Sequence, residues 1–165
     1  MPRARTVTAD APRHEALRTW LRLLSCAHLV EGEVRRRLRG NFGITLPRFD
    51  LLAQLDAAAR DDVHGLTMSE LSRRLMVTNG NLTGLVERLV IEGLVSRAAL
   101  ASDRRTQIVR LTGAGRRALH AMTPAHERWI EELFQDIAPA DREQLSTLLG
   151  RLRTSVQRSL AAEPA

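Results

Sequence analysis

The chain has 165 residues, 44% of them apolar, which suffices to bury the core of one ordinary domain. With only 10 glycine and 6 proline residues it fits neither a disordered nor a collagen-like class. All 25 basic residues are arginine, and with 19 acidic residues the formal net charge is +6. A single cysteine excludes an internal disulfide, and no apolar run approaches the roughly 18 residues of a membrane span. These features favour a soluble cytoplasmic protein without membrane association.

The first predicted helix covers residues 13–39, after a loose tail of residues 1–12. Its apolar residues recur at roughly helical spacing, and the glycines of "GNFG" (40–43) supply a stop. A second helix is expected after a capping Thr45, with Pro47 in its first turn. The polar segment 60–65 then reads as a loop.

Two short helices joined by a tight connection are predicted next. Thr67 and Glu70 have the spacing of a capping box, so a helix should begin at Met68. Residues 76–78 form the connection, Thr78 is expected to cap the following helix, and Gly93 is placed for a left-handed stop. This arrangement is typical of a helix-turn-helix.

After these helices the apolar period changes from helical to alternating. Residues 95–111 predict two strands around the polar tip "ASDRR" (101–105), which is a wing directly after the helix-turn-helix. Two long helices follow, one opening at Thr112 and one after residues 138–141. Their apolar stripes, like that of the first helix, are wider than a winged domain of about 60 residues can cover. We therefore expect them to pack against a second copy of the chain.

The helix over residues 79–92 has two glycines on one side. Placed at 100° per residue, its leucines and valines form one face, while Gly80 and Gly84 lie on the opposite face beside Asn81, Thr83 and Arg88. The side chains that are missing leave this outward face flat and slim. The alternative is that the two glycines permit close packing between helices inside the protein.

A flat face edged by asparagine, threonine and arginine suits a helix that enters the major groove of DNA. Asparagine can bind an adenine edge, and arginine can reach guanine or phosphate. Residues 66–117 also hold nine arginines against four acidic residues, so the positive charge is concentrated in this region. Arg73 and Arg74, on the preceding helix, are expected to contact phosphates, the alternative being ordinary solvated surface.

The segments "LTMSELSRRLMVTNGNLTGLVERLVIEGLVSR" and "SDRRTQIVRLTGAGR" resemble the MarR family of bacterial winged helix-turn-helix regulators. The resemblance implies a homodimer joined by the terminal helices, a palindromic operator, recognition helices in the major groove and wings in adjacent minor grooves. Arg105 suits the negative potential of a narrow minor groove, where Asp103 can hold its guanidinium. A solvated hairpin tip is the alternative for this segment.

The predicted fold is therefore mainly α-helical with a two- or three-stranded β wing. The expected parts are an N-terminal dimerisation helix (13–45), a winged helix-turn-helix domain (46–112), C-terminal dimerisation helices (113–160) and a tail (161–165). The residues expected to bind double-stranded DNA are Arg73, Arg74, Thr78, Asn79, Gly80, Asn81, Thr83, Gly84, Arg88, Asp103, Arg104 and Arg105.

The resemblance also implies a small effector, often aromatic or anionic, that enters a pocket between the dimer helices and the DNA-binding lobe. Trp20, His28, Phe49 and Trp129 are candidates for its lining, although tryptophan on a helical stripe is more often part of a core. Some relatives sense oxidation through a cysteine of the first helix. This chain has no tyrosine to stabilise such a thiolate, so Cys26 is expected to be buried and inert.

We expect a ligand-responsive transcriptional regulator, a repressor with an activator as the alternative, because the sequence does not give the sign of regulation. The alternatives are a nonspecific architectural DNA-binding protein and a cysteine-based redox-sensing regulator. No nucleophile–base pair, glycine-rich phosphate loop or cofactor motif supports an enzyme. The five histidines show no metal-ligand spacing, so no metal site is predicted.

Overall fold

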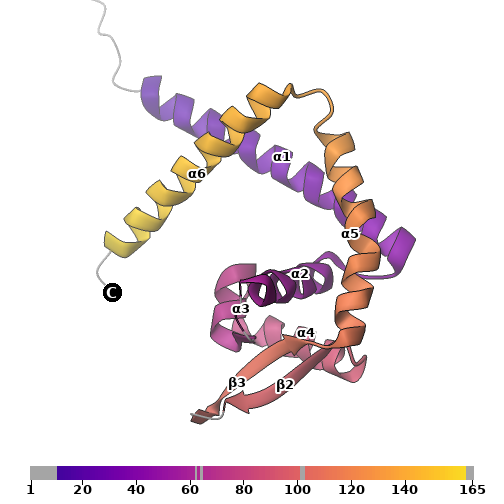
Figure 1. Cartoon of the computed structure of the whole chain (residues 1–165). Coiled ribbons are helices and arrows are strands. Elements are labelled where there is room, and N and C mark those ends of the chain that lie inside the picture. The colour runs from indigo at the N-terminus through magenta and orange to yellow at the C-terminus, as the bar shows by residue number, and fades with distance from the viewer. Residues whose placement is uncertain (1–10, 62, 64, 101–102, 163–165) are drawn as a thin grey trace, which may run out of the picture. The chain divides into compact units, whose positions relative to one another are not determined.

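The structure is a computed structural model that describes residues 11–61, 63, 65–100 and 103–162, excluding the side chains of residues 11–13, 79, 100 and 103–105. In this part of the chain, six helices and three strands follow one another (Figure 1). They are α1 (Ala11–Phe42), α2 (Leu46–Arg60), β1 (Leu66–Thr67), α3 (Met68–Leu75), α4 (Asn79–Ile91), β2 (Val95–Leu100), β3 (Asp103–Leu111), α5 (Gly113–Leu133) and α6 (Pro139–Ala162). The mainly helical fold with a small wing is the one the sequence predicts.

The first two helices begin and end close to where their residues predict. Helix α1 runs through Gly40 and ends before Gly43, which takes the left-handed conformation (φ 64°). Helix α2 has a proline in its first turn, and Thr45 occupies the N-cap position with extended backbone. The predicted N-cap position of Thr45 is confirmed, although the Thr45 hydroxyl makes no capping hydrogen bond.

The wing is a three-stranded antiparallel sheet in the order β1-β3-β2. Strand β3 pairs with β2 along most of its length, with Val95 opposite Leu111, and β1 adds two residues on its other side, with Leu66 opposite Val109. Leu66, Val95 and Val109 are all buried. The alternation of inward and outward residues in β3 thus attaches the wing to the helical core.

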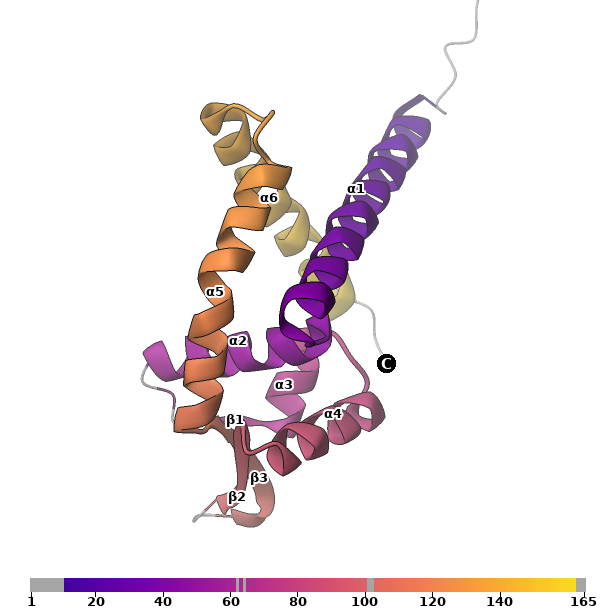
Figure 2. The same cartoon turned by 90° about the vertical axis from the view of Figure 1, so that its right-hand side faces the viewer.

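Residues up to His126 form one compact unit, in which α2, α3 and α4 pack together with the strands beside α4 (Figure 2). The C-terminal end of α1 joins this unit through contacts with α2. Its core includes the following aliphatic side chains, each at most 3% exposed: Val34, Leu38, Leu51, Leu52, Leu55, Ala58, Leu66, Leu71, Leu82, Val86, Leu89, Val95, Val109 and Leu119.

Much of the apolar surface of the terminal helices is exposed in the single chain. On α1, Trp20 and Leu29 are 53% and 72% exposed, and α6 has no buried residue. Cys26 is exposed as well, so the expectation of a buried thiol is wrong. Cys26 lies on a stretch of α1 where the side chains next to it, Ser25 and Ala27, are exposed as well. Pairing of these faces with a second copy stays a prediction.

The second unit comprises residues 127–165, of which the structure describes the end of α5, the turn after it and α6. Helix α5 passes through Pro124 without interruption and ends at Leu133, so Ile137 lies in the turn and not in the helix that its spacing predicts. None of the helices described is long and apolar enough to cross a membrane.

Candidate nucleic-acid interface

Helix α3 begins with a complete capping box. The Glu70 amide donates to the Thr67 hydroxyl (3.2 Å), and the Thr67 amide donates to the Glu70 carboxylate (2.8 Å). The Thr67 backbone N–H is the main cause that lowers the pKa of Glu70, with a further contribution from the Thr67 hydroxyl. The predicted capping box is confirmed, and it fixes where the helix-turn-helix starts.

The turn between α3 and α4 has a fixed geometry. Met76 takes the left-handed conformation (φ 52°), and the Ser72 hydroxyl donates to the Val77 carbonyl (2.6 Å). Thr78 occupies the N-cap position of α4, as predicted, although its hydroxyl makes no capping hydrogen bond. The Thr78 carbonyl accepts from the Leu82 amide (3.0 Å), which closes the first turn of α4.

Helix α4 presents the two faces that its sequence predicts. Leu82, Val86 and Leu89 are fully buried against the core. On the opposite side, Gly80 and Gly84 are exposed, and no atom lies within 4 Å of the Cβ position at either glycine. Among the described residues, nothing outside the backbone of α4 itself packs against these two positions, so the alternative role in close helix packing is not borne out and the outward face of α4 is open and slim.

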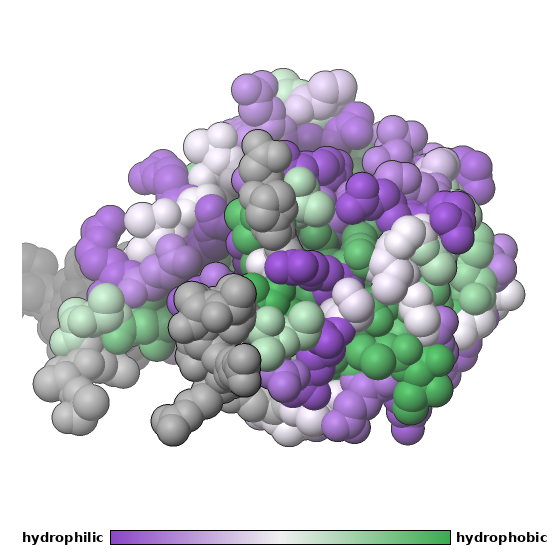
Figure 3. Space-filling view, turned by 60° about the horizontal axis from the view of Figure 1, so that its bottom comes forward, coloured by the Kyte–Doolittle hydropathy of each residue, from purple (hydrophilic) through white to green (hydrophobic). Residues whose placement is uncertain are grey.

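Polar groups surround this open face. Asn81 and Arg88 are exposed on α4, Thr83 is half-buried, and Arg73 and Arg74 are exposed in the last turn of α3. Figure 3 shows the side of the molecule that carries the wing, where hydrophilic residues cover much of the surface. The structure thus brings the predicted groups of α3 and α4 to one exposed region.

Four predicted residues can be followed only through their backbone. Strand β3 begins at Asp103 and includes Arg104 and Arg105, and α4 begins at Asn79. The side chains of these residues lie outside the described part of the structure. Their expected contacts with DNA accordingly stay predictions.

The junction between wing and α5 explains the residues "LTGAG". The Thr112 hydroxyl donates to the Gly93 carbonyl (2.7 Å) and accepts from the Gly115 amide (3.0 Å). A Cβ at Gly115 would lie only 1.9 Å from the Leu94 carbonyl oxygen. Gly93 itself is left-handed (φ 69°), as predicted for the end of α4. One hydroxyl and a required glycine thereby join α4, the wing and α5.

The four candidate effector residues occupy different environments. Trp20 and His28 are exposed on α1, whereas Phe49 and Trp129 are buried. The Phe49 ring lies against the His126 ring, with centroids 4.7 Å apart. The two cavities described for this structure are lined by other residues. An effector pocket built from these four residues stays a prediction.

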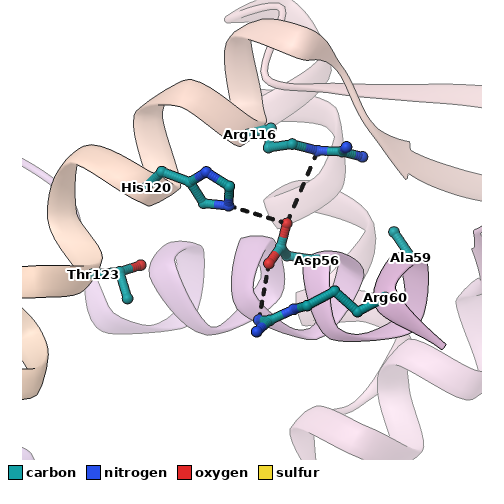
Figure 4. A pocket seen from close by; sticks show the side chains of 6 residues that line it. All are labelled: Asp56, Ala59, Arg60, Arg116, His120 and Thr123. Carbon is teal, nitrogen blue, oxygen red and sulfur yellow. Dashed lines mark ion pairs between the residues drawn. The ribbon is translucent and has the colours of Figure 1, made fainter.

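One of these cavities, of about 340 Å³, surrounds a charged group that the sequence pattern did not reveal. The carboxylate of Asp56 on α2 is buried and lies 2.9 Å from Arg60, 4.0 Å from Arg116 and 3.5 Å from His120 (Figure 4). Arg116 and His120 belong to α5, so the cluster connects α2 with α5. Its only sequence signal is an aspartate beside Leu55 on the inward face of α2. Among the described residues, no group of three side chains could hold a metal ion.

A helix-turn-helix followed by an antiparallel wing defines a winged helix-turn-helix, a class of DNA-binding domain. A sequence profile of the MarR family matches residues 42–106, which span the end of α1 to the start of β3. The transcriptional activatory protein BadR of Rhodopseudomonas palustris is 31% identical over 135 residues, covering 81% of this chain and 75% of that protein.

Solved structures of MarR family regulators are similar to this chain as well. A MarR family transcriptional regulator from Silicibacter pomeroyi is 33% identical, with a TM-score of 0.72, covering 90% of this chain and 99% of the other. Sco3205 from Streptomyces coelicolor, a MarR family regulator crystallised in complex with DNA, is 26% identical, with a TM-score of 0.76, covering 95% and 94%. The chain belongs to the MarR family of DNA-binding transcriptional regulators.

Proposed function

We propose that the protein is a sequence-specific repressor that binds a palindromic operator as a homodimer and is released by a small effector. The observation that carries the proposal is the outward face of α4, on which Gly80 and Gly84 leave open space between polar side chains. A slim helix surface of this kind can approach base edges closely in the major groove.

Each polar group has a distinct role in this proposal. Asn81 and Thr83 read base edges, and Arg88, one to two turns further along α4, reaches guanine or phosphate. Arg73 and Arg74 bind phosphates and thereby fix the register of the domain without reading sequence. Arg105 at the wing enters the minor groove with its guanidinium held by Asp103.

The homodimer forms through the exposed apolar faces of α1 and α6. One face of α6 carries three apolar side chains at intervals of four residues, each nearly half exposed: Leu148, Leu152 and Val156. Trp20 of α1 is 53% exposed. Exposed large apolar side chains that recur along one face of a helix support association with another copy of the chain. A two-fold dimer presents two recognition helices, which matches a palindrome with half-sites about one helical turn apart.

The effector is proposed to be a small aromatic or anionic molecule bound near Trp20, His28, Phe49 and Trp129. The exposed Trp20 ring offers a stacking surface and His28 a polar group, and both lie on the helix proposed to dimerise. An effector that binds more tightly to a dimer whose DNA-binding lobes are spaced differently from the operator half-sites would lower operator affinity. The loss of affinity would grow with the effector's preference for that state.

The test is selection of bound duplexes from a random pool, followed by affinity measurements at fixed salt. We expect two inverted half-sites about 10 base pairs apart. Asn81→Ala should cost about 1–3 kcal/mol at one base pair and relax the preference there, while Arg105→Ala should weaken binding to all variants alike.

Uniform affinity for all sequences with only a salt dependence would overturn the proposal in favour of a nonspecific architectural protein. Small aromatic acids added to the selected complex test effector release. Transcription from a promoter that overlaps the selected site tests repression, and an increase in transcription on binding would contradict that part.

A further inference from the structure

An ion pair ties the end of the recognition helix to α2. The guanidinium of Arg48, in the first turn of α2, pairs with the carboxylate of Glu92, the C-cap residue of α4. The two residues are 44 positions apart in the chain. The Arg48 side chain is only 20% exposed and that of Glu92 41%.

Each member of the pair is unfavourable at its position without the other. The Nε atom of Arg48 is buried and finds no hydrogen-bond partner among the residues that the structure describes, so Arg48 is held in this place at a desolvation cost. Glu92 places a negative charge at the negative end of the α4 dipole. The guanidinium offsets that charge, and the carboxylate compensates the partly buried cation. Pairing therefore explains why both residues occupy these sites.

The pair adds a second directional contact at the C-terminal end of α4, beside the hydrogen bond from the Thr112 hydroxyl to the Gly93 carbonyl. The inner face of α4 is formed by Leu82, Val86 and Leu89, whose packing is not directional. A charged hydrogen bond at Glu92 fixes one end of the helix in a defined direction. Asn81 lies eleven residues away, about 16 Å along the axis, so a swing of about 10° at Glu92 moves it by about 3 Å. That displacement is close to the rise of one base pair, about 3.4 Å.

Arg48 lies close to the connection between α1 and α2, so its contact with Glu92 relates the direction of α4 to that of α1. Helix α2 starts four residues after the end of α1, the helix proposed to dimerise, and the two helices contact each other. We propose that the Arg48–Glu92 pair is a positioning contact that sets the tilt of α4 relative to α1. In the dimer it thereby sets the half-site spacing that the protein accepts. This inference rests on the proposed operator binding.

The experiment measures the affinity of full-length protein for duplexes whose two selected half-sites are separated by the optimal spacer, or by one base pair more or fewer. The variants are Arg48→Met, Glu92→Gln and the charge swap Arg48→Glu with Glu92→Arg. Arg60→Met is the matched control, since it removes an arginine ion pair at the other end of α2.

We expect the unmodified protein and Arg60→Met to lose at least about tenfold affinity when the spacer changes. Arg48→Met and Glu92→Gln should each flatten this profile to below about threefold, their combination should be no flatter than either alone, and the charge swap should restore the sharp profile. Circular dichroism establishes that each variant is folded, and Glu92→Gln carries the test should Arg48→Met fail to fold.

A sharp profile with an unchanged optimum in either folded single variant would overturn the inference. A second result would also overturn it: Arg48→Met lowers the affinity for duplexes of every spacer length equally, and Glu92→Gln raises it equally. Those opposite signs would identify a simple charge effect on phosphate binding. Absence of any preferred spacing in the unmodified protein would instead contradict the proposed operator binding itself.

Discussion

Filling the open face of α4 should stabilise the protein while weakening its binding to DNA. Gly84 lies in the interior of α4, and the Cβ of an alanine there would meet no atom within 4 Å. Glycine in a helix interior costs roughly 1 kcal/mol relative to alanine. Gly84→Ala should thus raise the free energy of unfolding by about that amount, and the melting temperature by about 2–4 °C for a chain of this size.

The same methyl group would occupy the surface proposed to approach the bases. Loss of about 1.4 kcal/mol of binding corresponds to tenfold weaker affinity for the selected operator. The assays are thermal denaturation by circular dichroism and operator binding by fluorescence anisotropy, performed on the same preparation. If Gly84 faces the groove, Gly84→Ala raises the melting temperature and lowers the affinity for the operator.

Gly40→Ala is the control, because Gly40 lies inside α1 with equally open space around its Cβ position. It should raise stability without changing operator affinity. If Gly84→Ala stabilises the protein and leaves operator affinity within about twofold of the original, Gly84 does not face the bases.

Three further substitutions test other parts of the structure. Gly115→Ala should lower the free energy of unfolding in urea melts by at least about 2 kcal/mol, because its Cβ would overlap the Leu94 carbonyl. Gly113→Ala is the control and should be nearly neutral, and similar melts for both variants would contradict the close approach at Gly115. Burial raises the pKa of Asp50 to about 6. Between about pH 4 and pH 6 the carboxyl of Asp50 is therefore protonated in the folded protein but ionised in the unfolded chain. Its contribution to the stability of the fold falls as the pH rises through this range. Asp50→Asn should accordingly stabilise the protein near pH 7.5 and have little effect near pH 4, and a pH-independent effect would refute the assignment. Met76→Gly should raise the melting temperature through a gain of about 1 kcal/mol, because its φ of 52° favours glycine, and a lower melting temperature would argue against that strain.

Features that depend on a few neighbouring residues could be predicted from the sequence. The capping box of Thr67 and Glu70, the left-handed Gly93 and the outward position of Gly80 and Gly84 follow from helix geometry and local hydrogen bonds. The N-cap positions of Thr45 and Thr78 could likewise be predicted, although neither hydroxyl makes a capping hydrogen bond.

Features that depend on distant residues could not be predicted. Arg48 and Glu92 are 44 positions apart, and Asp56 and Arg116 are 60 apart, so only the packing of α2 against α4 and α5 brings their charges together. The exposure of Cys26 depends on whether anything covers α1, which a helical periodicity does not state. The strand β1 has two residues, too few to give an alternating pattern.

The central claim, that the open face of α4 enters the major groove, is tested most directly by methylation protection with dimethyl sulfate on the selected operator. This reagent methylates guanine N7 in the major groove and adenine N3 in the minor groove. We predict protection of guanine N7 in two patches about 10 base pairs apart, with protection lost selectively in the Gly84→Ala variant. Protection confined to adenine N3, with every guanine N7 still reactive in the bound complex, would contradict it.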